Sequence, residues 1–212
     1  MEAIKDKTLV MIVGPAAIGK SSLMNTVVTY DDEFGRVSGF TTRPARSNDE
    51  PGMYRYLSKQ EAIDLIESGD VVQYAVHPTT GAMYGSQTID YPKPYNMLDT
   101  LSNVVENLRE LPFKRTVAIS LTTNPERWEA WFLERYPVPS EERTKRLNEA
   151  ILSVEWSLSQ SDNHFWLVNT PDNLNGSARR LINTVRQNTS TPEVPIEAVM
   201  LLDKAKSLLS YK

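Results

Sequence analysis

The sequence contains no cysteine. A chain without cysteine forms neither a disulfide framework nor a metal site with thiolate ligands. This composition fits a reducing compartment, so we expect the protein to be cytoplasmic.

The sequence also has no excess of positive charge. Its 23 lysines and arginines stand against 27 aspartates and glutamates, which gives a net charge of −4. Binding along a nucleic acid requires many basic residues to neutralise phosphates, so we expect no nucleic-acid partner. A small basic site for one nucleotide remains compatible with this balance.

Long apolar runs are absent as well. No run approaches the roughly 20 residues that cross a bilayer. We therefore expect no membrane partner. The N-terminal sequence MEAIKDKTLVMIVG lacks the apolar core and cleavage site of a signal peptide, so we expect no signal peptide either. The chain has 212 residues, of which 40% are hydrophobic and 24% charged. These values are typical of one globular domain, or one domain with a small appendage.

Apolar runs and helically spaced segments alternate along most of the chain. Short apolar runs predict strands at 8–13, 35–40, 71–76, 116–121 and 165–168, and the edge of a strand at 96–99. Periodic spacing and capping residues predict helices at 19–30, 59–69, 101–111, 125–135, 141–158, 177–186 and 196–210. Strands that alternate with helices indicate an α/β fold with a mainly parallel sheet.

Residues 36–90 break this alternation, because they combine short strands with one helix. We expect them to form an insertion between two core segments, residues 1–35 and 91–187. Residues 188–212 read as a linker followed by a C-terminal helix. Four residues of that helix fall on one stripe: Ala198, Leu202, Ala205 and Leu209. The stripe predicts either a helix docked on its own domain or a dimer contact, so a monomer and a homodimer both stay open.

The sequence VGPAAIGKSS at residues 13–22 fits the pattern G-x-x-x-x-G-K-[ST] between a predicted strand and a predicted helix. Glycines let the backbone curl so that successive N–H groups point at phosphate oxygens. The N-terminus of the following helix adds a favourable dipole. The alternative is a glycine turn with a surface lysine, but the strand-to-helix context favours a phosphate loop.

This loop predicts a site for MgATP. The residues that we expect to bind its phosphates are Gly14, Pro15, Ala16, Ala17, Ile18, Gly19, Lys20, Ser21 and Ser22. Lys20 supplies a charge to the β- and γ-phosphates, and the Ser21 hydroxyl is the predicted Mg²⁺ ligand.

A second cluster combines arginines with tyrosines in the segments TTRPAR and GMYRY. Arginine presents a rigid fork of donors that matches phosphate oxygens. Arg43 and Arg46 near Tyr54 therefore suggest a clamp for a second phosphate, and the later segment YGS adds Tyr84 and Ser86. The alternative is a solvated basic loop with ordinary packing aromatics, and the residues alone leave both open.

These motifs together resemble the guanylate kinase family over about residues 8–187. The matching segments follow the family's order: the phosphate loop, VSGFTTRPARSNDEPGMYRYLS, SGDVVQYA, YGSQ, LERYPVPSEERTKRLNEA and a Val168-Asn169 strand end. The resemblance implies a P-loop NTPase fold with a parallel core sheet flanked by helices. It also implies a guanylate kinase-like domain at 1–187, in which 36–90 binds a nucleoside monophosphate and about 135–147 forms a short lid.

The resemblance implies the reaction ATP + GMP = ADP + GDP. The expected catalytic residues are Lys20, Arg135 and Arg146, with both arginines reaching from the lid onto the transferring phosphoryl group. Without the resemblance, these two arginines would be ordinary helix-surface charges. Asn169 would lie beside the adenine. The expected acceptor-binding residues are Ser38, Arg43, Arg46, Tyr54, Gln73, Tyr84, Ser86 and Asp99.

The chain departs from the family pattern at four places. Ser38 stands one residue before the family's base-contacting serine, and Gly39 takes the matching position. Either Asp49 or Glu50 could stand for the family's glutamate in the rearranged loop. The family's guanine-reading glutamate falls on Gln73, and its D-x-D strand end is reduced to Asp99.

Gln73 bears most directly on the acceptor. Guanine presents two neighbouring donors, and a carboxylate accepts from both, whereas a glutamine amide has one acceptor oxygen. A charge-assisted hydrogen bond contributes about 1.5–3 kcal/mol against about 0.5–1.5 for an ordinary one. Guanine binding should therefore be weaker by roughly tenfold or more, or the site takes another nucleotide or ribose bisphosphate. A phosphopeptide-binding module is a further alternative, although such modules usually lose the phosphate loop that this chain retains.

Overall fold

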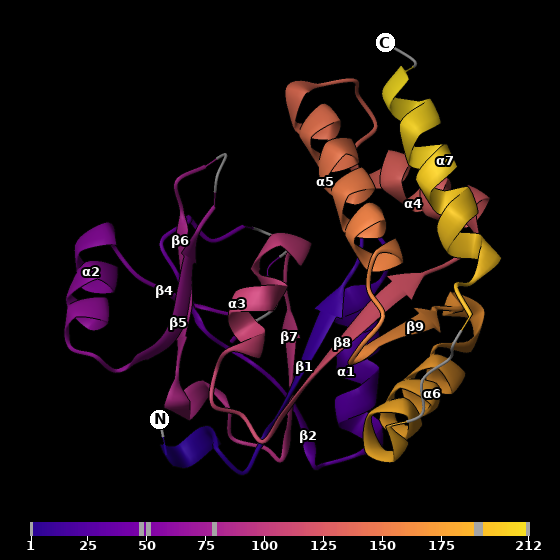
Figure 1. The fold of residues 1–212 in the computed structure, drawn as a ribbon. Coiled ribbons are helices and arrows are strands. Elements are labelled where there is room, and N and C mark those ends of the chain that lie inside the picture. The colour runs from indigo at the N-terminus through magenta and orange to yellow at the C-terminus, as the bar shows by residue number, and fades with distance from the viewer. Residues whose placement is uncertain (1, 47–48, 50–51, 78–79, 189–192, 211–212) are drawn as a thin grey trace.

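The computed structural model describes residues 2–46, 49, 52–77, 80–188 and 193–210. These residues form two β-sheets with helices around them (Figure 1). Residues 189–192 of the predicted linker lie outside the described residues.

The core sheet has five strands in the order β2-β7-β1-β8-β9, and all of its pairs are parallel. Its strands are β1 (Thr8–Val13), β2 (Phe34–Arg36), β7 (Tyr95–Asp99), β8 (Arg115–Thr122) and β9 (His164–Val168). The predicted α/β fold with a parallel core sheet is confirmed. The strand residues predicted at 96–99 belong to β7, which is an inner strand between β2 and β1.

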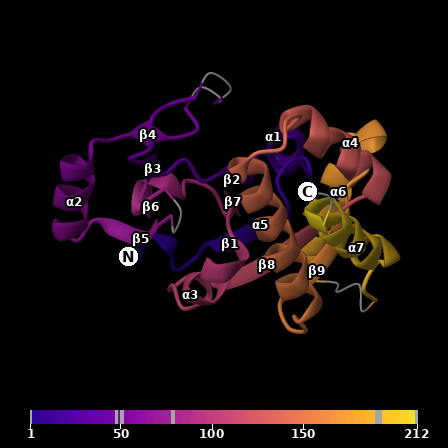
Figure 2. The same ribbon diagram turned by 90° about the horizontal axis from the view of Figure 1, so that it is seen from above.

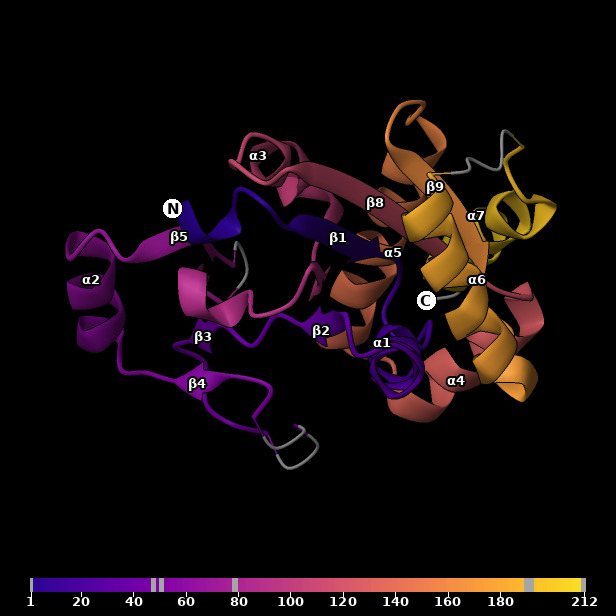
Figure 3. The same ribbon diagram turned by 90° about the horizontal axis from the view of Figure 1, so that it is seen from below.

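Helices cover both faces of this sheet. The even residues of β1, Val10 and Ile12, pack into a cluster with α1 (Lys20–Tyr30) and α6 (Leu174–Gln187). The odd residues Leu9, Met11 and Val13 pack into a second cluster with α3 (Val105–Arg109). Figure 3 shows α1 and α6 together on one face and α3 on the other. The solidly apolar sequence of β1 follows from this burial on both sides.

The second sheet lies within the predicted insertion. Its order is β4-β3-β6-β5, and its strands are β3 (Phe40–Thr41), β4 (Arg55–Tyr56), β5 (Val71–Val76) and β6 (Met83–Gln87). One face packs against α2 (Lys59–Glu67) through Phe40, Ala62 and Met83. A capping box begins α2, since the Ser58 hydroxyl accepts from the Glu61 N–H and the Glu61 carboxylate accepts from the Ser58 N–H. Seen from above, this sheet and α2 lie at one end of the molecule, far from α4 (Pro125–Arg135), α6 and α7 (Ile196–Ser210) (Figure 2).

The single strand predicted at 35–40 is wrong. The chain instead leaves the core sheet after Arg36 and enters the second sheet at Phe40. Gly39 permits this crossing, because a Cβ at that position would lie 2.1 Å from the Gly85 carbonyl oxygen. The helix predicted at 101–111 is shorter than expected, with a 3₁₀ turn at Ser102–Val104 followed by α3. Leu111 precedes a proline, which disfavours helical geometry at Leu111.

The C-terminal helix α7 is docked on its own chain. Its bounds agree with the prediction, and Ala198, Leu201 and Ala205 are fully buried. Lys206 on α7 forms an ion pair of 2.8 Å with Glu155 on α5 (Glu141–Leu158), and Lys204 pairs with Glu129 on α4 at 2.9 Å. Figure 1 shows α7 running beside α5. Within the described ranges, no helix combines the length and the apolar character that a membrane span requires.

Candidate active site

The loop of residues 14–19 joins the carboxyl end of β1 to the first turn of α1. Gly14 and Gly19 have φ of 152° and 88°, a region that favours glycine. Ala17 also has a positive φ, 63°, which is uncommon for a residue with a side chain and concentrates at binding sites. No side chain caps α1 at Gly19. The N–H groups of the first turn have no acceptor within the helix, so the loop has the geometry of an anion-binding turn.

Two side chains from other elements hold this loop through hydrogen bonds to its carbonyl groups. The indole of Trp128 on α4 donates from Nε1 to the Ala16 carbonyl at 2.9 Å. The amide of Asn169, after β9, donates from Nδ2 to the Ile18 carbonyl at 3.0 Å. Both residues are buried, Asn169 with 1% of its surface exposed. Asn169 thus lies against the phosphate loop, while its predicted position beside an adenine stays a prediction. Trp128 could not be identified from the sequence, because an apolar residue at helical spacing carries no signal of a long-range hydrogen bond.

Lys20 folds back over the loop. Its ammonium group donates to the carbonyls of Gly14 at 2.6 Å and Pro15 at 3.1 Å. It also lies 3.7 Å from Asp99 Oδ1, at the carboxyl end of β7. Carboxyl ends of parallel strands are where open α/β sheets bind ligands. The structure therefore brings the predicted residues Lys20 and Asp99 together.

Mg²⁺ prefers oxygen ligands and keeps several waters, so one or two protein oxygens together with nucleotide phosphates hold it. Ser21, in the first turn of α1, and Asp99, beside Lys20, offer such oxygens. The described residues contain no group of three or more His, Cys, Asp or Glu side chains placed to form an all-protein metal site. The donors present thus fit a metal ion that arrives with a nucleotide.

The second cluster centres on Arg43. Its two terminal nitrogens each donate to Asp49 at 2.7 Å, and its guanidinium lies over the rings of Tyr54 and Tyr56, at 5.3 and 5.7 Å from their centroids. Asp49 also accepts from the Tyr56 hydroxyl at 2.6 Å and the Arg46 N–H at 2.7 Å. These hydrogen bonds, that of Arg43 first, hold the pKa of Asp49 well below its usual value. Asp49 is thus the hydrogen-bond partner of Arg43 in this loop, while Glu50, the other candidate for the family's glutamate, lies outside the described residues.

Tyr54 and Tyr84 complete the cluster. Their rings meet edge to face at 5.9 Å, which places Tyr84 of β6 beside the arginine segment. Burial, followed by the charge of Asp99, raises the pKa of Tyr54 to about 12, so its hydroxyl remains a hydrogen-bond donor at neutral pH. Arg46 is exposed. Arg43, Tyr54 and Tyr84 thus form one surface with donors suited to an anion.

The predicted base-reading residues lie farther along the same sheet. Gln73 and Ser86 are opposite each other in the β5–β6 register, and Gln73 Nε2 donates to Ser86 Oγ at 3.2 Å. Ser86 Oγ also forms a hydrogen bond of 2.6 Å with the hydroxyl of Tyr91. Ser86 and Tyr91 are buried, and burial raises the pKa of Tyr91 to about 12. Tyr91 could not be identified from the sequence, since it belongs to no motif.

Ser38 is not brought into this group. Its hydroxyl donates to the carbonyls of Gly52 and, at 3.3 Å, Met53. The neighbouring Gly39 matches the position of the family's serine, but with this backbone any side chain there would collide with the Gly85 carbonyl. The departure at 38–39 therefore has a steric cause.

The two predicted lid arginines flank the segment between α4 and α5. Arg135 ends α4, is exposed and lies 5.7 Å from the centroid of the Tyr136 ring. Arg146 lies in the second turn of α5, where its Nη1 donates to Glu149 Oε2 at 2.7 Å. Their contact with a phosphoryl group stays a prediction.

Comparisons with known proteins agree with this geometry. The family model described as guanylate kinase matches residues 6–91. A guanylate kinase of Jannaschia sp. (strain CCS1) is 33% identical over 79 residues, which cover 37% of this chain and 35% of that protein. A guanylate kinase of Alkalilimnicola ehrlichii is 32% identical over 69 residues, or 32% of this chain and 34% of that protein. The matched segments thus span about a third of the length of these curated relatives.

A solved structure extends the likeness to the whole fold. The crystal structure of guanylate kinase from Anaplasma phagocytophilum superposes with a TM-score of 0.53, and the match covers 97% of this chain and 94% of that chain. The identity is 18%, so this comparison concerns the fold alone. Residues 6–91 contain the phosphate loop and the arginine–tyrosine cluster, whereas Asp99, Arg135, Arg146 and Asn169 lie outside the matched sequence.

Proposed function

We propose that the chain is a member of the guanylate kinase family and that it transfers the γ-phosphoryl group of MgATP to a nucleoside monophosphate, with GMP as the first acceptor to test. One observation carries the proposal: a phosphate loop and an arginine–tyrosine anion site occur together in the matched residues 6–91, on two different sheets. A phosphoryl-transfer enzyme needs two such sites, because it holds a donor and an acceptor phosphate at once.

The loop and Lys20 hold the donor in this proposal. Backbone N–H groups of 14–19 and the first turn of α1 bind the phosphates of ATP, and Lys20 leaves the Gly14 and Pro15 carbonyls to reach them. Ser21 and Asp99 would hold Mg²⁺, which would supply positive charge to the phosphates of the nucleotide. Trp128 and Asn169 keep the loop in place, which limits reorganisation during the reaction.

The second sheet holds the acceptor. Arg43, Arg46, Tyr54 and Tyr84 bind the monophosphate, and Asp49 orients the Arg43 fork. Arg135 and Arg146 stabilise the charge of the transferring phosphoryl group, since catalysis of this reaction is mostly positioning and electrostatic stabilisation. From the composition we further propose a cytoplasmic protein with no nucleic-acid or membrane partner, while the stripe of the C-terminal helix leaves a monomer and a homodimer open.

Gln73 favours a second candidate, a kinase of the same family with a different acceptor. Residue 73 is a glutamine, so the site has no carboxylate at this position. The Gln73 amide donates a hydrogen bond to Ser86, which is itself hydrogen-bonded to Tyr91. Other nucleoside monophosphates and ribose bisphosphate are the acceptors to compare. A phosphopeptide-binding module without kinase activity is the remaining alternative.

A coupled assay of ADP formation tests the proposal with GMP, dGMP, AMP, UMP, dTMP and ribose bisphosphate. We expect turnover with at least one of them, and GMP is the first to compare. Lys20→Ala should abolish turnover with little loss of stability, because the Lys20 side chain serves phosphate and not packing. Lys114→Ala, at an exposed position just before β8, is the matched control. A Lys20→Ala variant with near-normal turnover, or a wild type that neither binds ATP nor uses any acceptor, would exclude the kinase assignment.

A further inference from the structure

The carboxylate of Glu149 lies between two parts of the molecule. Its Oε2 accepts from Arg146 Nη1 at 2.7 Å, one turn away on α5. Its Oε1 lies 3.9 Å from Nε2 of His77, the residue that follows β5 in the second sheet. All three side chains are largely shielded, with exposed fractions of 29% for Glu149, 22% for Arg146 and 13% for His77. One carboxylate therefore connects the second sheet to α5.

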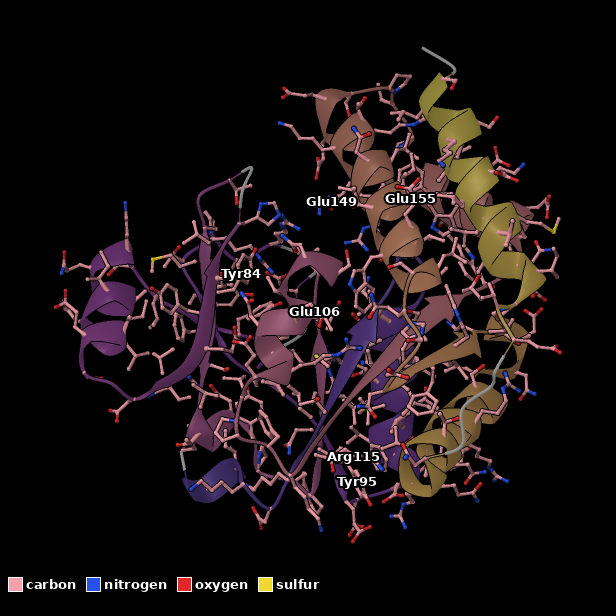
Figure 4. The ribbon with its side chains drawn as sticks, in the orientation of Figure 1. Tyr84, Tyr95, Glu106, Arg115, Glu149 and Glu155 are labelled. Carbon is pink, nitrogen blue, oxygen red and sulfur yellow. The ribbon has the colours of Figure 1, made fainter. Side chains whose placement is uncertain are left out.

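The contacts continue into the acceptor cluster. The imidazole of His77 lies 6.4 Å from the ring of Tyr84, measured between centroids. Figure 4 shows Tyr84 on the side of the second sheet turned toward α5, and Glu149 on the side of α5 turned toward that sheet. Contacts thus run from a candidate acceptor-binding residue, through His77 and Glu149, to the candidate catalytic Arg146.

An ordinary surface ion pair does not have this arrangement. Lys145 and Glu141, also on α5, form an i,i+4 pair whose side chains are 43% and 83% exposed. Such exposed pairs contribute little, because solvent screens them and both side chains are flexible. Glu149 differs because its second oxygen faces another sheet, so its orientation depends on how close that sheet lies.

We propose that His77 and Glu149 form the contact by which the acceptor-binding sheet closes against α5, and that Glu149 thereby positions Arg146 for phosphoryl transfer. Arginine has a long, flexible side chain, and fixing its guanidinium before the reaction lowers the entropy lost in the transition state. His77 and Glu149 are positioning residues, since they act through Arg146. The part of the proposal that concerns Arg146 rests on the proposed kinase function.

A distance measurement tests the closure contact without any assay of activity. The chain has no cysteine, so cysteines introduced at Lys59 on α2 and Thr144 on α5 can be spin-labelled selectively. We expect His77→Asn and Glu149→Gln each to lengthen or broaden the distance distribution from pulsed EPR, and the double variant to resemble either single one. Glu155→Gln, on the same helix but paired with Lys206, is the matched control and should leave the distribution unchanged. Unchanged distances in both variants would overturn the closure contact.

Kinetics test the positioning of Arg146. Glu149→Gln should lower kcat by about 5- to 10-fold, corresponding to roughly 1–1.4 kcal/mol of transition-state stabilisation, and leave both KM values within about twofold. In an Arg146→Ala background the same substitution should have no further effect. Altered distances with an unchanged kcat would overturn the positioning role alone. A wild type that transfers phosphate to no acceptor would exclude the proposed function, while the distances would still decide the closure contact.

Discussion

Asp49 accepts a hydrogen bond of 2.7 Å from each terminal nitrogen of Arg43. The pair is bidentate, and its side chains are only 12% and 11% exposed. This geometry fixes the plane of the guanidinium between Tyr54 and Tyr56 and raises the pKa of Arg43 above its usual value, chiefly through the hydrogen bonds to Asp49. Arg43 is therefore a preformed cation of defined orientation at the candidate acceptor site.

Removal of this cation should weaken binding of the acceptor and not of ATP. We expect Arg43→Ala and Arg46→Ala each to raise the acceptor KM by about 10- to 100-fold, since a hydrogen bond to a charged group contributes about 1.5–3 kcal/mol. The KM for ATP should change by less than about threefold. Arg186→Ala is the control, because Arg186 is ion-paired with Asp31 beyond the far end of α1. Equal effects on the two substrates would show that these arginines do not act on the acceptor phosphate.

His164 predicts a loss of stability at acidic pH. Its ring packs edge-on against Trp156 and Trp166 and hydrogen-bonds with Ser120 Oγ at 2.7 Å. Burial, and then the charge of Arg109, lowers its pKa from 6.5 to about 4. The folded state thus favours neutral His164, and this stability is complete above pH 6.5 and lost as the pH falls toward 4. The difference amounts to about 3 kcal/mol.

Urea unfolding at pH 7 and pH 4.5 measures this effect. The free energy of unfolding of the wild type should fall by about 2–3 kcal/mol more than that of His164→Gln, because glutamine does not titrate. Carboxylates titrate equally in both proteins and cancel in the comparison. Parallel pH dependences of the two proteins would contradict a neutral buried His164.

The docking of α7 predicts a large cost for its buried leucine. Leu201 is fully buried in the main core cluster, so Leu201→Ala should lower the free energy of unfolding by about 2–4 kcal/mol. Val199→Ala on the exposed face, where Val199 is 41% exposed, should change it by no more than about 0.5 kcal/mol.

A chain truncated after Asn188 should melt at a lower temperature with an unchanged number of subunits by light scattering. A halved mass would instead indicate that α7 is a dimer contact.

Local signals in the sequence were sufficient for much of the fold. The helix α7 has the predicted bounds, and α4 and α5 begin at the predicted residues, directly after their N-caps Asn124 and Ser140. These features depend on neighbours in the sequence: an apolar period and a side chain that accepts a backbone N–H. The phosphate loop belongs to the same class, because its glycines and lysine are close together in the sequence.

Contacts between distant segments could not be predicted in this way. Trp128 reaches the phosphate loop from 112 residues away, and Glu149 of α5 meets His77 of the second sheet. The prediction of one strand at 35–40 is wrong for the same reason. The chain crosses from one sheet to the other between Arg36 and Phe40, and the close approach of Gly39 to Gly85 is visible only in the structure. Composition and periodicity carry no information on these distances, so Tyr91, Trp128 and Glu149 needed the structure.

Gln73 gives the sharpest test of the acceptor. Gln73→Glu introduces a carboxylate beside Ser86 and Tyr91, whose hydroxyls can both donate to it. If the site is a weakened guanine site, the carboxylate regains two acceptors for guanine, and kcat/KM for GMP should rise by about tenfold, or roughly 1.4 kcal/mol. If the site serves another acceptor, activity with that acceptor should fall while GMP stays poor. Steady-state kinetics of both proteins over the acceptor panel distinguish a weakened guanine site from a site for another acceptor.

Gln60→Glu, on the exposed surface of α2, controls for the added negative charge. A wild type that prefers a non-guanine acceptor, or a Gln73→Glu variant that gains nothing on GMP, would exclude the guanylate assignment and leave the family's fold with a different substrate.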